Sequence, residues 1–428
     1  MRNFSVTLLS VIIMLFTTTA HAQQTDFSAN RLARIDSLIQ KHIKAQHIPG
    51  ATVLLIKKGK IVYNKAFGYA DIEAKKAMQT DHIFRIASQS KAITSLAVMM
   101  LWEQCKFLLD DPVSMYIPAF KNPKVLDHYN TNDGTYTTKD ATREITVRDL
   151  LRHTSGIAYS ALFSDPTMWH IYEKADIPSG IGTSKSTIKE KMELLATMPL
   201  QHHPGEQFTY GLNIDLLGYL IEIWSGSPLD VFLQENVLTP LAMHDTHFYI
   251  PEKKQPRLVG LYEINAADKL VKVDHPIYEG VDANFPKIKG TYHAGGAGLS
   301  ATTADMANFY SLFLNNGIFN GKRLLAGKTV ELMLRNQLGD QVTIAPNPPL
   351  AENLQFSLAG FSVVTPKNAY LSPQSIGSFG WGGAFNTHGW ADPQEGVIAL
   401  LFTQEYLSPW FTIGEEFQTA VYQALDDL

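Results

Sequence analysis

Two serine–lysine pairs with the same spacing are the first feature of this 428-residue chain that could do chemistry. They are Ser88 with Lys91 and Ser186 with Lys189. On a helix, residues three apart lie on the same face, with Cβ atoms about 5–6 Å apart. A lysine whose charge is disfavoured by burial can accept the serine proton and so create a nucleophile. Because the pattern is short and occurs twice, at least one copy is expected to be a chance occurrence.

The surroundings of the two pairs differ. Ser88 follows a β-prone triplet and opens a largely apolar helix, where the helix N-terminus favours developing negative charge. Ser186 lies in the charged, solvated start of another helix. We therefore predict that Ser88 is the nucleophile and that Lys91 is buried beside it. The alternative is that Ser88 caps a helix and that Lys91 extends its charge to solvent.

Six blocks in sequence order resemble the serine β-lactamase-like superfamily of class C type. That superfamily includes class C β-lactamases, DD-peptidases and family VIII carboxylesterases. The blocks are Ser88-Gln89-Ser90-Lys91, Leu108 to Pro112, Tyr116-Ile117-Pro118, Leu150 to Gly156, Pro204 to Gly218 and Gly295-Gly296-Ala297-Gly298-Leu299 with Asp305-Met306. The similarity covers roughly Ile35 to Tyr422.

The resemblance implies that a tyrosine exchanges the serine proton, and Tyr210 stands in the matching block. The block departs from the Y-x-N of β-lactamases, because Leu212 stands where asparagine is usual and Asn213 comes one residue late. The pattern Y-G-x-x-x-D-x-L-G is similar to the esterase branch. The chain therefore lacks the side-chain amide with which lactamases hold a β-lactam.

A third block also differs from the β-lactamase pattern and resembles that of the esterases. No K-[ST]-G occurs, and Gly380-Trp381-Gly382-Gly383-Ala384-Phe385 at the matching place resembles the W-G-G of family VIII esterases. The resemblance implies that Trp381, Gly382 and Gly383 contact the substrate, with glycines that allow close approach to the strand. It also implies an oxyanion hole formed by the backbone N–H groups of Ser88 and Ala384. The alternative for Trp381 is a buried aromatic of the core.

The elements that must position these residues come from both ends of the chain. A helix is predicted over Asp26–Gln46, strands over Ala51–Ile56 and Ile61–Phe67, and β-prone pieces with a closing helix over the last eighty residues. The pattern predicts an α+β, β-lactamase/transpeptidase-like fold. It has an antiparallel sheet flanked by N- and C-terminal helices, with a mostly helical insertion.

We predict a single catalytic domain over residues 27–426. It consists of an α/β subdomain (27–84 with 290–426) and a mainly helical subdomain (85–289). A helix is expected over Ala92–Leu109, and Lys121–Glu144 is expected to be a long polar surface excursion.

The amino-acid composition excludes some classes of protein and of partner. Apolar residues make up 45% and charged residues 18%, as in globular proteins, and the net charge of −5 excludes nucleic acid or an anionic membrane as the main partner. The single cysteine, Cys105, excludes an internal disulfide and Cys-rich metal sites, and we expect it to be a small buried side chain.

Residues 1–22 are predicted to be a signal peptide, because one basic residue, an apolar run and Ala20-His21-Ala22 succeed one another. The alternative is a membrane anchor, for which the apolar run is short and has no second flanking block of charges. We therefore expect an exported protein, periplasmic or secreted, with no stable membrane span once the signal peptide is cleaved.

Together these features predict a serine hydrolase that forms an acyl-enzyme on Ser88, most simply a carboxylesterase acting on short or medium acyl esters. It would need no metal or organic cofactor. One alternative is a β-lactamase or D-amino-acid-specific peptidase on the same scaffold. Another is a non-catalytic acyl-binding or assembly protein. The acyl pocket is expected from the loops Ala158–Trp169 and Tyr278–Lys289, and the oligomeric state stays open.

Overall fold

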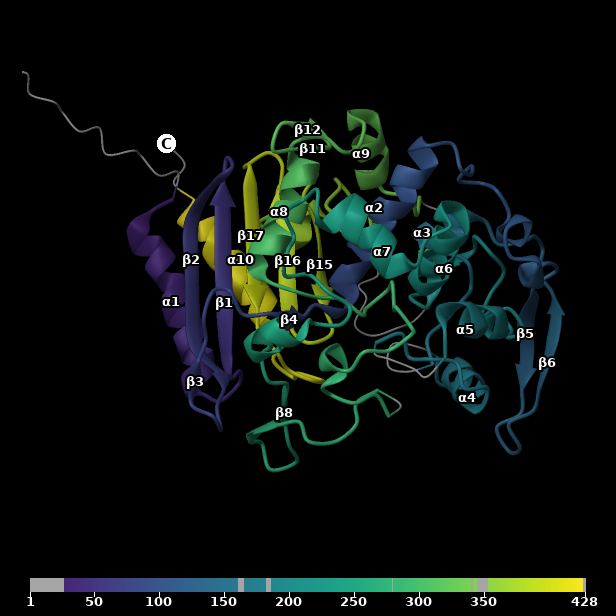
Figure 1. Cartoon of the computed structure of the whole chain (residues 1–428), viewed down its shortest axis with the longest axis horizontal. Coiled ribbons are helices and arrows are strands. Elements are labelled where there is room, and N and C mark those ends of the chain that lie inside the picture. The colour runs from purple at the N-terminus through teal and green to yellow at the C-terminus, as the bar shows by residue number, and fades with distance from the viewer. Residues whose placement is uncertain are drawn as a thin grey trace, which may run out of the picture.

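A seven-stranded antiparallel sheet forms the centre of the computed structural model, which describes residues 27–160, 165–181, 186–278, 280–339, 342–344 and 353–425 (Figure 1). The proposed signal peptide lies outside the described residues. From one edge to the other, the strands run β14 (Ser362–Val363), β15 (Phe379–Gly383), β16 (Thr387–Asp392), β17 (Val397–Phe402), β1 (Gly50–Lys57), β2 (Lys60–Asp71) and β3 (Lys76–Ala77). Strands from the two ends of the chain therefore meet in the middle, where β1 pairs with β17.

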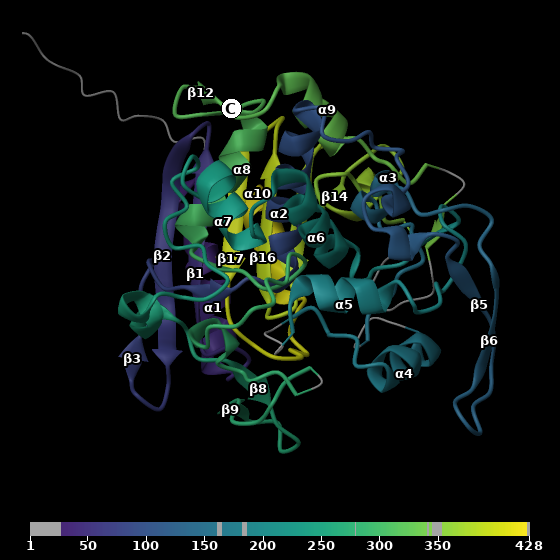
Figure 2. The ribbon, with the colours of Figure 1, turned by 45° about the vertical axis from the view of Figure 1, so that its right-hand side comes forward.

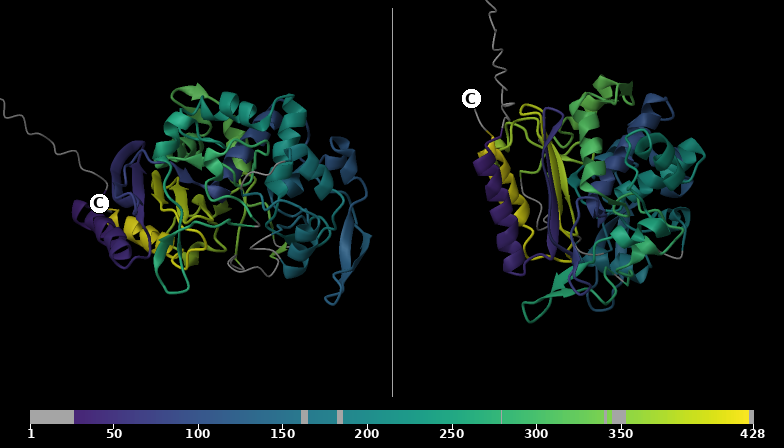
Figure 3. Two further views of the ribbon diagram at one scale, coloured as in Figure 1. Left: turned by 60° about the horizontal axis from the view of Figure 1, so that its bottom comes forward. Right: turned by 60° about the vertical axis from the view of Figure 1, so that its left-hand side comes forward.

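Helices cover both faces of this sheet. The helices α1 (Ala29–Lys44) and α10 (Ile413–Ala424) pack side by side on one face, as the right-hand view of Figure 3 shows. The helix α8 (Thr303–Leu314) packs on the other face. Strand β1 is buried on both faces, because helices cover both faces of the sheet. Its alternate side chains point to opposite faces. Val53 joins the core beneath α1 and α10, whereas Leu54 joins the larger core on the opposite side.

The middle of the chain is mainly helical. Its helices, with a late one from the C-terminal third, are α2 (Ser90–Glu103), α3 (Val147–Leu151), α4 (Pro166–Lys174), α5 (Ile188–Leu195), α6 (Asn213–Ser225), α7 (Leu229–Leu233) and α9 (Gly327–Leu334). The apolar helices α2 and α6 pack against each other (Figures 1 and 2). The predicted α+β architecture, with helices at both ends and a helical insertion, is confirmed.

Short strand pairs complete the structure. They are β4 (Phe84–Arg85) with β10 (Ser300–Ala301), β7 (Gln207–Phe208) with β13 (Thr343–Ile344), β8 (Tyr262–Ile264) with β9 (Leu270–Lys272), and β11 (Ile318–Phe319) with β12 (Lys322–Arg323). The segment expected to be an irregular excursion contains an antiparallel hairpin, β5 (Lys124–Tyr129) with β6 (Tyr136–Asp140), which projects at the edge of the molecule (Figure 2). Its polar side chains hid the strand pattern, because both of its faces meet solvent except at Val125.

Two further details differ from expectation. Helix α2 ends at Glu103 instead of continuing to Leu109, because Cys105 has a left-handed backbone with φ of 56°. Cys105 is exposed, so the prediction of a buried thiol is wrong. Across the described part of the chain, no single helix is long and apolar enough to cross a bilayer. One bent pair, Asn213–Ser225 with Leu229–Leu238, passes that test by length and composition alone.

Candidate active site

Ser88 lies in a single 3₁₀ turn, Ala87–Gln89, that leads directly into α2. Ala87 has a positive φ of 40°, a strained conformation for a residue with a side chain. Residues 82–87, 89 and 90 are buried, whereas Ser88 is half-buried. The turn therefore presents the serine hydroxyl while it encloses the residues around it.

Lys91 is completely buried one turn further along. Its Nζ donates hydrogen bonds to Ser88 Oγ at 3.2 Å and to the carbonyl oxygen of Gly296 at 2.9 Å. A side chain at Gly296 would not fit, because its Cβ would lie 2.6 Å from Asp215 Oδ2. The G-G-x-G-L block thus supplies a carbonyl acceptor and the space that lets it approach the lysine.

The pKa of Lys91 is subject to opposing effects. Burial does favour the neutral amine, but the phenols of Tyr159 and Tyr210 favour the ammonium, and the pKa of Lys91 lies above its ordinary value. Lys91 is thus hydrogen-bonded to the serine oxygen, with the rings of two tyrosines beside its amino group.

Tyr210 is the nearest phenol with a defined partner. It is buried just before α6, and its ring centre lies 4.5 Å from Lys91 Nζ. The indole Nε1 of Trp381, on β15, donates a hydrogen bond to Tyr210 Oη at 3.0 Å. The phenol of Tyr210 thus contacts both the buried lysine and the strand that carries Trp381.

The histidine of the Leu150–Gly156 block supports Tyr210 from behind. The ring centres of His153 and Tyr210 are 4.9 Å apart, and burial lowers the pKa of His153 well below its ordinary value. Asn213 Nδ2 lies 3.0 Å from His153 Nδ1, and Ser155 Oγ donates to Asn213 Oδ1 at 2.5 Å. Asn213 is fully buried in this network. Asn213 therefore holds His153, whose ring packs against Tyr210. Because Asn213 is fully buried, its side chain cannot contact a substrate.

Two more residues belong to the site, Tyr159 from the predicted acyl loop and Asp215, to which no role was assigned from the sequence. Tyr159 lies with its ring centre 5.5 Å from Lys91 Nζ, and burial raises its pKa although the Lys91 charge opposes the shift. Asp215 is fully buried, and burial raises its pKa to about 7 against the opposing effect of Lys91. Tyr292 Oη donates to Asp215 Oδ1 at 3.1 Å. Both residues lie in or next to sequence blocks that carry the resemblance to the superfamily. Tyr159 follows Gly156 by three residues, and Asp215 is the acid of the Y-G-x-x-x-D pattern.

The hairpin of β15 and β16 ends against the serine turn. A Cβ on Gly383 would lie 2.3 Å from the carbonyl oxygen of Ile86, so only glycine allows this approach. Gln89 Nε2 donates to Thr387 Oγ1 at 3.2 Å, and Ala384 packs against the apolar cluster that contains Ala87. The structure thus brings Gly383 and Ala384 to the segment that carries Ser88.

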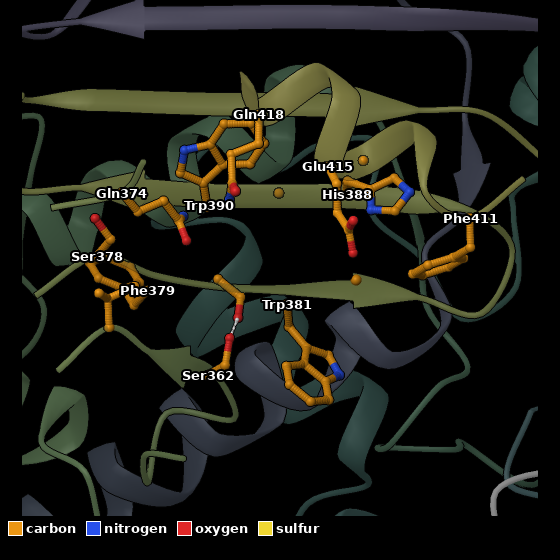
Figure 4. A pocket seen from close by; sticks show the side chains of 15 residues that line it. Ser362, Gln374, Ser378, Phe379, Trp381, His388, Trp390, Phe411, Glu415 and Gln418 are labelled. Carbon is orange, nitrogen blue, oxygen red and sulfur yellow. Dashed lines mark hydrogen bonds between the residues drawn. The ribbon is translucent and has the colours of Figure 1, made fainter. Parts of the chain in front are cut away.

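Trp381 also lines a hollow on the hairpin of β15 and β16. A cavity of about 220 Å³ lies along β15 and β16 toward α10, and its lining includes Glu415 and Gln418. Figure 4 shows the Trp381 ring extending away from both of these side chains. The ring is half-buried and packs edge-on against Phe356, with centres 5.3 Å apart. Trp381 is therefore both a partner of Tyr210 and part of an aromatic cluster.

The other predicted segments are placed as follows. Ser186 precedes α5, where Thr187 and Glu190 form a capping box, and Lys189 is exposed. Of the predicted acyl loops, Tyr278–Lys289 contributes to the apolar cluster around Ala87. Part of the other loop, residues 161–164, lies outside the described residues. Within the described ranges, no group of three or more His, Cys, Asp or Glu side chains could hold a metal ion.

The chain is similar to several known proteins. The family described as Beta-lactamase matches residues 35–417. Protein Rv1367c of Mycobacterium tuberculosis is 32% identical over 362 residues, covering 83% of this chain and 86% of that protein. Esterase EstB of Burkholderia gladioli is 28% identical over 398 residues, covering 90% and 94%. The solved structure of EstCE1, a hydrolase with promiscuous acyltransferase activity, has a TM-score of 0.77 and 26% identity, covering 92% and 98%.

Proposed function

The chain belongs to the beta-lactamase family, and from this premise we propose that it is a serine carboxylesterase that acts on short or medium acyl esters. The family and the relatives indicate a hydrolase of the β-lactamase/esterase type. The proposal adds the mechanism and the substrate class. It rests on the contacts of Ser88, Lys91, Tyr210 and Trp381.

In the proposed mechanism, Ser88 Oγ attacks the ester carbonyl and Tyr210 accepts its proton. Lys91 lies over the Tyr210 ring and the Trp381 N–H donates to its oxygen, so both hold Tyr210 in place for this proton transfer. The N–H groups of Ser88 and Ala384 hold the carbonyl oxygen as its negative charge develops. Tyr210 then returns the proton to the departing alcohol, and the acyl group stays on Ser88. Water attacks the acyl-enzyme by the same route and releases the carboxylic acid and the free serine.

The observation that carries the substrate class is the hydrogen bond from Trp381 to Tyr210. Lactamases and DD-peptidases have a cationic K-[ST]-G residue where this chain has an indole whose N–H is already used. A substrate carboxylate would therefore lose charge-assisted hydrogen bonds, which contribute roughly 1.5–3 kcal/mol each. A neutral ester loses nothing by this exchange.

The alternatives rank lower on the same grounds. A β-lactamase or D-amino-acid-specific peptidase would need anchors that the Leu212 and Trp381 positions do not provide. A non-catalytic acyl-binding or assembly protein would have no use for a buried lysine 3.2 Å from an accessible serine.

The test compares two chromogenic substrates on the same preparation. We expect kcat/KM for p-nitrophenyl butyrate to exceed that for nitrocefin by at least about 100-fold. This ratio corresponds to the loss of one or two charge-assisted hydrogen bonds. Efficient nitrocefin turnover with negligible ester hydrolysis would reverse the ranking of the two activities.

We also propose that the protein is exported and that its signal peptide is removed before Gln23. N-terminal sequencing of the mature protein from its native cell envelope or medium should begin at Gln23. Recovery of the intact N-terminus from the cytoplasm would contradict export.

A further inference from the structure

A buried acid outside the proposed mechanism lies behind the hairpin of β15 and β16. Glu405, three residues after β17, has no exposed surface. Its carboxylate accepts hydrogen bonds from Thr403 Oγ1 at 2.8 Å, from Ser408 Oγ at 3.0 Å, and from Asn386 Nδ2. Among the described residues, no lysine or arginine forms an ion pair with it. Because a buried carboxyl without a counter-ion is costly, its hydrogen bonds point to an element that they hold in place.

The held element is the turn that follows Ala384. Asn386 has a left-handed backbone with φ of 63°, and its N–H donates to the carbonyl oxygen of Gly383 at 2.9 Å. Because Asn386 Nδ2 donates to Glu405, its Oδ1 is the acceptor for His388 Nε2 at 2.7 Å. The Glu405 backbone N–H also donates to the carbonyl oxygen of Phe385 at 3.1 Å. Glu405 therefore contacts the turn through both its side chain and its backbone.

The neighbouring Gln404 holds the other segment of the site. Its Oε1 accepts from the backbone N–H of Arg85 at 2.7 Å, and its Nε2 donates to the carbonyl oxygen of Arg85 at 3.3 Å. Arg85 lies in β4, three residues before Ser88. Adjacent side chains of an extended segment point to opposite sides. Gln404 thus contacts the segment that carries Ser88, and Glu405 contacts the turn that contains Ala384.

We propose that Gln404 and Glu405 are positioning residues that fix the separation between the Ser88 and Ala384 N–H groups, and so preorganise the oxyanion hole. This inference rests on the proposed function, since it assigns the geometry of the same site. Neither side chain needs to contact the substrate. Both act through backbone segments, and donors fixed before the reaction stabilise the developing oxyanion without reorganisation.

The informative variant is Glu405→Gln. It keeps the size of the side chain but replaces one acceptor oxygen by an NH₂ group, so at least one of the donors Thr403, Ser408 and Asn386 must reorient or lose its partner. Complete loss of one oxyanion-hole donor costs about 10²–10³-fold in kcat, so a displaced donor should cost less. We expect kcat for p-nitrophenyl butyrate to fall about 10- to 100-fold, with KM within about twofold of wild type.

Asp392→Asn is the matched control. Asp392 is also a fully buried carboxyl on this hairpin, but it lies at the opposite end of β16 from the turn. It accepts hydrogen bonds from Tyr422 Oη at 2.7 Å and from the Ser375 N–H at 3.1 Å. The same acid-to-amide change there should lower the melting temperature but leave kcat within about threefold of wild type.

A second readout isolates the oxyanion hole from general damage. The ratio of kcat for an ester to kcat for its thionoester reports how strongly the donors bind the carbonyl oxygen, because sulfur is the weaker acceptor. Glu405→Gln should lower this ratio at least about fivefold, and Asp392→Asn should leave it unchanged. If Glu405→Gln does not fold, Ser408→Ala removes one donor to the same carboxylate and should lower kcat and the ratio in the same direction.

Two outcomes would overturn the inference. One is a folded Glu405→Gln or Ser408→Ala variant with wild-type kcat, and the other is a loss of kcat with an unchanged ester-to-thionoester ratio. A wild-type protein that hydrolyses no ester, and is not labelled on Ser88 by a fluorophosphonate, would contradict the proposed function itself. The two failures are therefore distinguishable.

Discussion

The pairs Ser88/Lys91 and Ser186/Lys189 share their residue types and spacing but have opposite environments. Lys91 is fully buried and donates to the serine and to a carbonyl 205 residues away. Lys189 is exposed, and the start of its helix is stabilised by the Thr187–Glu190 capping box. A serine–lysine spacing thus becomes a candidate catalytic site only where other elements enclose the lysine and orient the serine.

The largest expected difference between the two copies is in acyl transfer. Ser88→Ala should reduce kcat for p-nitrophenyl butyrate by at least about 10³-fold, because no other group can form the acyl-enzyme. Ser186→Ala should retain wild-type kcat. Mass spectrometry after fluorophosphonate treatment should place the adduct on the peptide that contains Ser88. An adduct on any other peptide would remove Ser88 from its proposed role.

Removal of the phenol that flanks the first pair should have the next largest effect. Tyr210→Phe keeps the ring but deletes the proton acceptor, so kcat should fall about 10²- to 10⁴-fold. The stability loss should stay near 1 kcal/mol, the contribution of one hydrogen bond. Single-turnover kinetics should show the defect in acylation and in deacylation.

The matched control is Tyr172→Phe, which removes another buried hydroxyl, on α4 and outside the site. It should leave both steps unchanged. A Tyr210→Phe variant with most of the wild-type kcat would mean that Lys91 acts without this tyrosine.

A smaller effect concerns the acid beside Lys91 and is seen in the pH dependence of stability. Burial raises the pKa of Asp215 from 3.8 to about 7, so the folded state binds its proton more tightly than the unfolded state. This contribution to stability is present below about pH 4 and is lost as the pH rises to about 7. Asp215→Asn should therefore gain stability relative to wild type as the pH rises from 4 to 8. Melting temperatures across this range measure the difference, and parallel curves for the two proteins would contradict the assignment.

The smallest expected effect is on stability and concerns the helix of the Ser186/Lys189 pair. Thr187→Ala removes the cap of α5 and should lower the free energy of unfolding by about 1 kcal/mol, as measured by urea denaturation. Ester hydrolysis should be unchanged. A large loss of activity would show that the second pair is coupled to the site after all.

The sequence was sufficient for the sheet built from both chain ends, for the two helices at its face and for the block that contains Ser88 and Lys91. Local patterns carry this information, because strand alternation and helix periodicity are properties of short segments. The β5–β6 hairpin was missed for the same reason, since a strand pair exposed on both faces shows no apolar alternation.

The electrostatics of the site could not be predicted in the same way. Tyr159 and Tyr210 raise the pKa of Lys91, and they lie 51 residues apart in the helical region. The sequence places a lysine near a serine but does not show which phenols and carboxyls surround it. It also named Trp381 as a substrate contact and could not reveal its hydrogen bond to Tyr210 across 171 positions.

The pairing of β1 with β17 has a consequence for the order in which the molecule is assembled. Thr52 lies opposite Phe402, so the central strand pair joins residues that are made at nearly opposite ends of synthesis. Contacts this distant in sequence form slowly, because a long loop must close before they stabilise the chain. Ser88, Lys91 and Tyr210 are synthesised long before β15 brings Trp381 and Ala384 to them. A nascent chain therefore carries the serine and the lysine before the strand that lies against them, and this part of the candidate site forms only after β15 has been made.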